Sequence, residues 1–143
     1  MNIIERDSFT IGEESRLTRQ ISDDDIHAFA NLIGDHNPIH INDEYASGTR
    51  FGKRIAHGLL IASLISNVLG NDLPGPGAIY IEQHLNFLAP IYIDEKVTVT
   101  VKVIDWNSIK GHVKLVTNIF NQDNVQVISG QARLVMSAFI QEK

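Results

Sequence analysis

The sequence contains no cysteine, so disulfide bonds, thiolate zinc sites and thiol nucleophiles are excluded. No apolar stretch approaches the roughly 20 residues that cross a bilayer, and the run at residues 58–62 ends at Ser63. The first residues also lack the basic region, apolar stretch and small-residue cleavage site of a secretory signal. We therefore expect a cytoplasmic protein without a membrane span.

Positive charge is scarce as well. The sequence has 12 Lys and Arg against 17 Asp and Glu, a formal net charge of -5, whereas a nucleic-acid surface needs a basic stripe that displaces counterions. We expect no nucleic-acid partner. One local cluster has the opposite sign, because Arg50, Lys53 and Arg54 lie within five positions. It is either a solvated loop or a site for the phosphates of a small ligand.

The remaining composition is that of a folded protein. Apolar residues make up 43% of the 143 residues and charged residues 20%, far from the composition of disordered chains. The length is typical of one domain, and no repeat or polar linker divides the chain. We expect residues 1–143 to form a single domain.

The hydrophobic period predicts helices in the first half of the chain. At residues 22–33, apolar side chains recur at the i, i+3, i+4 and i+7 positions of an amphipathic helix. Ser22 and Asp25 match a capping box at its start, and Gly34 ends it. A second, short helix is predicted at residues 43–47, after a capping Asn.

The longest predicted helix, at about residues 56–69, is apolar on nearly all sides and must therefore be wrapped by other elements. The second half of the chain alternates with the period of two that is typical of strands. Four strands follow one another there, the last at residues 125–138 with a bulge expected at Gly130, and a weaker strand is expected at residues 15–21. Consecutive strands imply an antiparallel sheet that curls around the helix, which is an α+β fold.

Residues 34–40 read Gly-Asp-His-Asn-Pro-Ile-His and form the first candidate site. Pro38 stiffens this turn because it restricts its own backbone and that of the residue before it. Asp35 and His40 on such a turn can hold one water and move protons near neutral pH, and Asn37 adds a neutral donor and acceptor. The alternative is an ordinary turn, in which Asp and Asn are common and His40 lies at the surface.

The second candidate is Gly58, which follows His57 at the head of the apolar helix. The first amides of a helix have no acceptor within the helix, and a glycine there lets a carbonyl oxygen approach an N–H closely, as in an oxyanion hole. The alternative is that Gly58 is small for packing alone. The histidines lack the spacing of a helical HExxH zinc site, and no phosphate-binding glycine loop is present, so we expect neither metal nor cofactor.

Residues 28–40 end in a Gly-Asp-x-Asn-Pro-x-His run that follows a predicted helix, and this segment resembles the signature of the MaoC-like (R)-specific enoyl-CoA hydratases. Further blocks are similar to those of this family in order and spacing: Tyr45-Ala46, Arg50-Phe51-Gly52, Ile55-Ala56-His57-Gly58 and Leu85-Asn86-Phe87-Leu88-Ala89-Pro90-Ile91. The resemblance covers roughly residues 14 to 138.

The resemblance implies a hot-dog fold, in which an antiparallel sheet wraps a long central helix, and a homodimer with the acyl thioester entering near the subunit interface. It implies reversible syn hydration of a trans-2-enoyl-CoA to the (R)-3-hydroxyacyl-CoA, without metal or organic cofactor. By position, Asp35 and His40 would hold and activate the water with support from Asn37, and the Gly58 amide would receive the thioester oxygen.

Five further residues are candidates for substrate binding. Ser66 and Leu69 lie three apart on the predicted central helix, where they either line an acyl tunnel together or pack in the core. Arg50, Lys53 and Arg54 would attract the phosphates of CoA. Three rival functions stay open: a (3R)-hydroxyacyl-[acyl-carrier-protein] dehydratase, a hot-dog thioesterase, and a non-catalytic acyl-CoA-binding subunit.

Overall fold

The computed structural model describes residues 2–140. The elements, in chain order, are β1 (Glu14–Gln20), α1 (Asp23–Ile33), α2 (Pro38–Ile41), α3 (Asp43–Ser47), α4 (Gly58–Asn71), β2 (Ala78–Phe87), β3 (Lys96–Asn107), β4 (His112–Asn121), β5 (Gln126–Met136) and the short 3-10 helix η1 (Ser137–Phe139). Within the described part of the chain, no helix combines the length and the apolar character needed to cross a bilayer.

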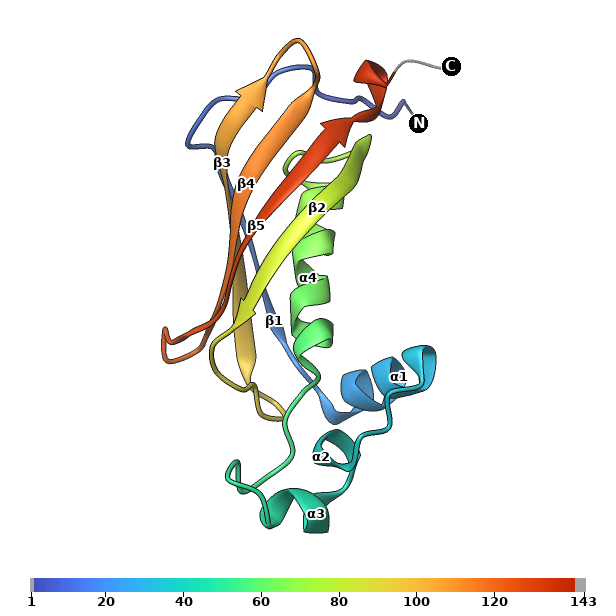
Figure 1. Ribbon diagram of the computed structural model, residues 1–143, viewed down its shortest axis with the longest axis vertical. Coiled ribbons are helices and arrows are strands. Elements are labelled where there is room, and N and C mark those ends of the chain that lie inside the picture. Colours follow the sequence, from blue (N-terminus) through green and yellow to red (C-terminus); the bar gives the residue numbers. More distant parts are fainter. Residues whose placement is uncertain (1, 141–143) are drawn as a thin grey trace.

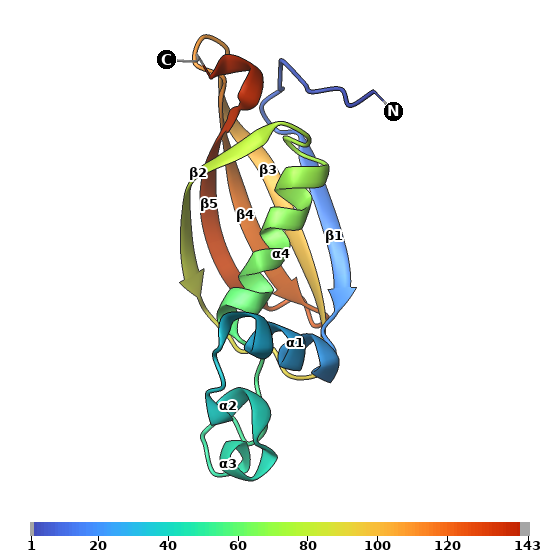
Figure 2. The same ribbon diagram turned by 90° about the vertical axis from the view of Figure 1, so that its right-hand side faces the viewer.

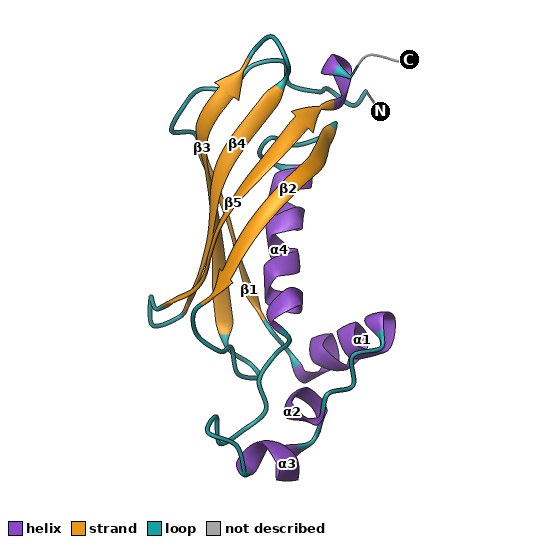
Figure 3. Cartoon of the chain, in the orientation of Figure 1, coloured by secondary structure: helices purple, strands orange, loops and turns teal. Residues whose placement is uncertain are grey.

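The five strands form one antiparallel sheet in the order β1-β3-β4-β5-β2. Strands β3, β4 and β5 follow one another as neighbours, whereas β2 leaves α4 and pairs with β5 at the far edge (Figure 1, Figure 3). The sheet curves around α4, which lies along its concave face (Figure 2). The hot-dog form of the α+β fold expected from the sequence is therefore confirmed.

The core lies between α4 and the concave face of the sheet. Alternate residues of β3 point into it, and four valines there are at most 1% exposed: Val97, Val99, Val101 and Val103. On α4 the matching side chains include Ile61, Ile65 and Leu69, exposed by 2%, 1% and 1%. Burial of such side chains contributes about 1.5–3 kcal/mol each, so this interface is the main source of stability.

The central helix is less completely wrapped than its composition predicts. One stripe of α4 is exposed on the side away from the sheet, and Leu59 in this stripe is 60% exposed. The neighbouring edge strand β2 also exposes apolar side chains, with Ile79 at 47% and Ile81 at 41%. The expectation of full burial is thus wrong for a single chain, because a sheet on one side leaves the opposite stripe of the helix free.

Helices α1, α2 and α3 gather at the end of the sheet where α4 begins (Figure 1). The capping box of α1 is formed as predicted, since the Asp25 N–H donates to the Ser22 hydroxyl and the Asp25 carboxylate accepts from the Ser22 N–H. Gly34 ends α1 in the left-handed conformation, with φ of 80°. The short helix α2 was not expected, because four residues are too few to show a helical period.

The expected bulge at Gly130 is wrong. Gly130 pairs in register with Leu85, and the register shifts fall elsewhere, between Tyr80 and Glu82 and between Ile119 and Phe120. Close packing against the neighbouring strand explains why position 130 is glycine, since a Cβ there would lie 2.5 Å from the carbonyl oxygen of His84. A missing side chain in a strand therefore marks a close backbone approach here.

Candidate active site

The loop between α1 and α2 is stabilised by its own side chains. The Asp35 Oδ1 accepts a hydrogen bond from the Asn37 N–H at 3.1 Å. The Asn37 side chain in turn caps α2, because its Oδ1 accepts from the Ile39 N–H at 3.3 Å. Pro38 occupies the first turn of α2, where a missing N–H costs nothing. Asn37 thus links Asp35 to the helix that carries His40.

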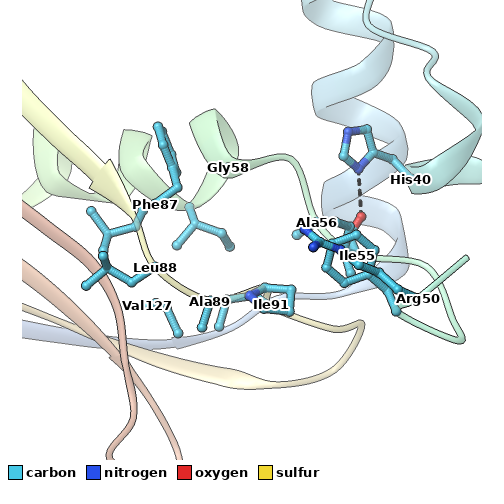
Figure 4. Close-up of a pocket in the computed structure, with 14 residues that line it drawn as sticks. His40, Arg50, Ile55, Ala56, Gly58, Phe87, Leu88, Ala89, Ile91 and Val127 are labelled. Atoms are coloured by element: carbon cyan, nitrogen blue, oxygen red, sulfur yellow. Dashed lines mark hydrogen bonds between the residues drawn. The ribbon is translucent and has the colours of Figure 1, made fainter.

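His40 lies on α2, is only 9% exposed, and has a defined tautomer. Its Nδ1 lies 2.8 Å from the carbonyl oxygen of Ile55 (Figure 4). A carbonyl can only accept, so Nδ1 carries the proton and Nε2 of the neutral ring has a free lone pair. Burial lowers the pKa of His40, and the nearby His57 lowers it further, against the bond to Ile55 and the charge of Asp35, which raise it. The ring is therefore neutral at pH 7.

His57 belongs to the same cluster, and sequence reasoning missed it as a site residue. Its ring stacks on that of His40 with centroids 3.9 Å apart and an interplanar angle of 29°. Its Nε2 lies 3.1 Å from the backbone oxygen of Asp35. One polar side-chain atom each of Asp35, His40 and His57 lies within 4.8 Å of the others. The available signal was its place directly before Gly58.

Three such side chains are also the residue types of a zinc site. His40 and His57 each use one ring nitrogen in a bond to a backbone carbonyl, which metal-bound histidines also do, so it is the orientation of the two rings that disfavours a shared metal. Their rings are stacked, whereas tetrahedral ligands approach a metal from divergent directions. The geometry is that of two stacked imidazoles beside the carboxylate of Asp35, with one bond from His57 to the Asp35 backbone oxygen.

His40 and Gly58 line one cavity of about 350 Å³. The rest of its wall is largely apolar and comes from the loop before α4, the start of α4, the end of β2 with the segment that follows it, and the start of β5 (Figure 4). Ile61, Phe87 and Val127 are among its apolar residues. Gly58 is the first residue of α4, so its N–H has no acceptor within the helix. His40 and the Gly58 N–H thus form a polar end of an otherwise largely apolar cavity, which fits a ligand with a reactive carbonyl and an alkyl chain.

The three basic residues occupy different environments. Arg50 lines the cavity and is exposed, with its guanidinium 4.9 Å from the centre of the Phe51 ring. Lys53 is also exposed, and its Nζ lies 4.7 Å from the centre of the Tyr92 ring. Both remain accessible to an anion.

Arg54 differs from its two neighbours because its side chain is only 9% exposed. Its guanidinium donates to Asp43 at 2.7 Å, to Asp23 at 2.8 Å and to the backbone oxygen of His40 at 3.1 Å. Arg54 therefore links α1, α2 and α3. Because its Nε and Nη1 donors are already used in these bonds, we do not assign it to the phosphates of CoA, although the sequence suggested this contact. The cluster seen in the sequence thus consists of two accessible cations and one arginine that is held by two structural ion pairs.

The structure also separates the two candidates for an acyl tunnel. Ser66 is exposed in a groove between α4 and β2, whereas Leu69 is 1% exposed and faces the core. Positions three apart on a helix differ by about 60°, which is enough here to place one on each side. Neither residue lines the cavity at His40 and Gly58.

Comparisons with known proteins agree with this architecture. Residues 8–124 match the family model described as MaoC like domain. The chain is 46% identical over 127 residues to the (R)-specific enoyl-CoA hydratase of Rhodospirillum rubrum, covering 89% of this chain and 88% of that protein. It is 42% identical over 132 residues to the 3-hydroxybutyryl-CoA dehydratase of Methylorubrum extorquens, covering 92% and 83%.

A solved structure is similar over nearly the same length. The (R)-hydratase from Aeromonas caviae involved in PHA biosynthesis superposes with a TM-score of 0.88 at 36% identity, covering 90% of this chain and 98% of that one. An acid–base cluster beside an apolar cavity, at the head of a helix that lies along the concave face of a sheet, defines the chain as a hot-dog protein of the hydratase type. The chain belongs to the MaoC-like family.

Proposed function

We propose that this protein is an (R)-specific enoyl-CoA hydratase, a hydro-lyase that reversibly adds water to a trans-2-enoyl-CoA and gives the (R)-3-hydroxyacyl-CoA. The observation that carries the proposal is that His40 and Gly58, the first residue of α4, line one apolar cavity, while a carboxylate oxygen of Asp35 lies within 4.8 Å of a ring nitrogen of His40. The relatives described above, which are named as hydratases and a dehydratase of CoA thioesters, support it.

Asp35 and His40 are the groups that handle the water. The Asp35 carboxylate accepts a hydrogen bond from it, and the lone pair on Nε2 of His40 accepts a second. As the water oxygen bonds to Cβ, the pair takes up one of its protons. A proton from the pair then adds to Cα on the same face, so the atoms of one water are added in total. Asn37 is a supporting residue, because it bonds to Asp35 and caps α2.

The Gly58 amide stabilises the charge that this attack creates. Addition at Cβ moves negative charge onto the thioester oxygen, and the N–H of a helix N-terminus is a preformed donor for it. A Cβ at position 58 would lie 2.8 Å from Cδ1 of Phe87. Both the approach of the thioester and the packing of Phe87 therefore require glycine at this position.

The substrate would lie across the cavity mouth, with its acyl chain among the apolar lining and its CoA moiety outside. Arg50 lines this cavity and Lys53 is an exposed cation three positions further along the same loop, and we assign both to the phosphates of CoA. Ser66 stays a prediction for acyl-chain selection, although it lies in the separate groove between α4 and β2 and does not line this cavity. Leu69 is better explained as a core residue.

A second copy of the chain is the partner that we propose for the exposed stripe. The apolar side chains gather on α4 and on the edge strand β2, where Leu59 is 60% and Tyr80 is 42% exposed. An exposed apolar edge strand is normally covered by a partner. We propose a homodimer, with one domain over residues 1–143 in each subunit. The cytoplasmic location also stays a prediction.

The test is to mix purified protein with crotonyl-CoA and to follow the loss of the enoyl absorbance. We expect rapid loss and an exclusively (R) product. The same assay with the crotonyl thioester of an acyl-carrier protein separates the dehydratase alternative, and release of free thiol would identify a thioesterase. Binding of crotonyl-CoA without turnover would identify a non-catalytic subunit and contradict the proposal.

A further inference from the structure

We propose that His57 is a positioning residue of the active site, which holds the Asp35 loop and the His40 ring together at the head of α4. The proposal rests on the proposed function and extends it, since His57 would act through Asp35 and His40 without touching the substrate. Four features of the His57 side chain support this role: its burial, its bond to Asp35, its stacking on His40, and the nitrogen that it leaves without a partner.

The first step concerns the Asp35 loop. Asp35 is exposed, and within residues 2–140 its other hydrogen bond lies inside its own loop, to the Asn37 N–H. The bond from Nε2 of His57 to the backbone oxygen of Asp35 is the one that connects this residue to another element. His57 is the N-cap residue of α4 and is 3% exposed, so its own position is well defined. The bond ties an exposed loop residue to a buried residue at the start of α4.

The second step concerns the His40 ring. Stacking at 3.9 Å leaves no room for the two rings to tilt independently. On α1, Phe29 packs edge-on against the His57 ring, with centroids 5.1 Å apart and an angle of 65°. The His57 ring is thus held between α1 and α2, and it fixes the plane in which Nε2 of His40 must meet the water. Catalytic groups depend on such placement, since a misplacement of about 1 Å can cost a hundredfold in rate.

The third step is that the fold alone does not favour a histidine here. The bond to the Asp35 carbonyl places the proton of the neutral ring on Nε2, so Nδ1 is an acceptor. In the described part of the chain this Nδ1 is buried without a hydrogen-bond partner. An unpaired buried acceptor destabilises a protein, and a phenyl ring would fill the same place without one. The imidazole is therefore explained by what its Nε2–H does for Asp35.

The experiment compares two substitutions that divide the features of this side chain. His57→Phe keeps an aromatic ring against His40 and loses the donor to Asp35. His57→Gln loses the ring and keeps an N–H donor, because its amide nitrogen is as many bonds from Cα as Nε2 of histidine. His36→Gln is the matched control, because it removes an imidazole from the exposed middle of the same loop.

Three quantities are measured for each variant: kcat and KM with crotonyl-CoA, the melting temperature, and the rate of amide hydrogen exchange at Asn37. For His57→Phe we expect a kcat that is lower by about tenfold to a hundredfold, a KM within about twofold of the parent, an unchanged or higher melting temperature and faster exchange at Asn37. His57→Gln should recover slow exchange at Asn37 but only part of the lost kcat, because it restores the donor to Asp35 and not the ring that stacks on His40. The control should match the parent.

Two results would overturn the proposal. One is a His57→Phe protein with kcat and Asn37 exchange like those of the parent. The other is a melting temperature that falls in both His57 variants together with their activity, since this would make His57 a structural residue. If the parent protein itself fails to hydrate crotonyl-CoA, the proposed function fails, while the exchange rates at Asn37 still decide whether His57 holds the loop.

Discussion

Gly58→Ala is the substitution whose effect follows most directly from the structure. The added methyl would lie 2.8 Å from both Cδ1 and Cε1 of Phe87, at least about 0.7 Å inside the usual carbon–carbon separation of 3.5–4.0 Å. Cα–Cβ bonds of a helix tilt toward its N-terminus, so the methyl also stands beside the N–H that we assign to the thioester oxygen. Loss of one such donor typically costs about 2.7–4 kcal/mol in the transition state.

We expect Gly58→Ala to lower kcat for crotonyl-CoA by about a hundredfold or more. Phe87→Ala and the double variant separate the two causes, because removal of the ring leaves room for the methyl. In the double variant the melting temperature should return toward that of Phe87→Ala alone, while kcat stays low. A Gly58→Ala protein that turns over within threefold of the parent would refute the assignment of the Gly58 amide as the oxyanion donor.

Three further predictions concern charge. The pKa of His40 is lowered from its ordinary value of 6.5, so the unfolded chain takes up the proton first as the pH falls, and the stability of the protein drops below pH 6.5 and levels off below the folded pKa. The acid limb of kcat/KM should likewise lie below pH 6.5. Thermal melts and rate profiles between pH 5 and 8 check both predictions. The charged or titratable groups beside His40 are Asp35, His57, Arg50 and Arg54. Replacing both Arg50 and Lys53 by Ala should raise KM for crotonyl-CoA several-fold and weaken the salt dependence of this KM, while kcat stays unchanged. The KM for a crotonyl-pantetheine thioester, which lacks the nucleotide phosphates, should also stay unchanged. Equal changes with both substrates would show that these residues do not bind the phosphates. Arg54→Gln should lower the free energy of unfolding by about 1–3 kcal/mol, because its charge-assisted bonds are lost while the carboxylates of Asp23 and Asp43 stay partly solvated. An unchanged midpoint of denaturant unfolding would contradict the role of Arg54 in linking the helices.

Local features of this protein were predictable from the sequence. The capping box of α1 depends on residues three apart, and the Asx turn at Asp35 and the cap at Asn37 depend on residues two apart. The period of two in β3 reports a sheet with one buried face. Asp35 and His40 could be proposed as a catalytic pair for the same reason, because they lie close together in the sequence, before and within the short helix α2.

Features that depend on distant contacts were not predictable in this way. His57 meets Asp35 across 22 positions, and Arg54 meets Asp23 across 31 positions. No local pattern distinguishes Arg54 from Lys53, although one is buried in an ion pair and the other is exposed. Only the packing of α1 to α3 against the head of α4 decides these roles.

The opposite placement of Ser66 and Leu69 has a related cause. Both are compatible with an apolar helix, and helical spacing alone does not say which side the sheet covers. The partner elements decide it, because β2 leaves a groove on one side of α4 while β1 and β3 cover the other. A helix that looks apolar on nearly all sides therefore has two different faces, one buried in the core and one exposed.

The central claim is that Asp35 and His40 together activate water for addition to an enoyl thioester, and the most direct test is crotonyl-CoA hydration by two conservative variants. Asp35→Asn keeps an oxygen for the Asn37 N–H, and His40→Asn keeps an N–H near the position of Nδ1 for the Ile55 carbonyl, so both should fold with melting temperatures near that of the parent. We predict that each loses about a hundredfold to ten-thousandfold in kcat. Turnover close to that of the parent in either variant would contradict the account.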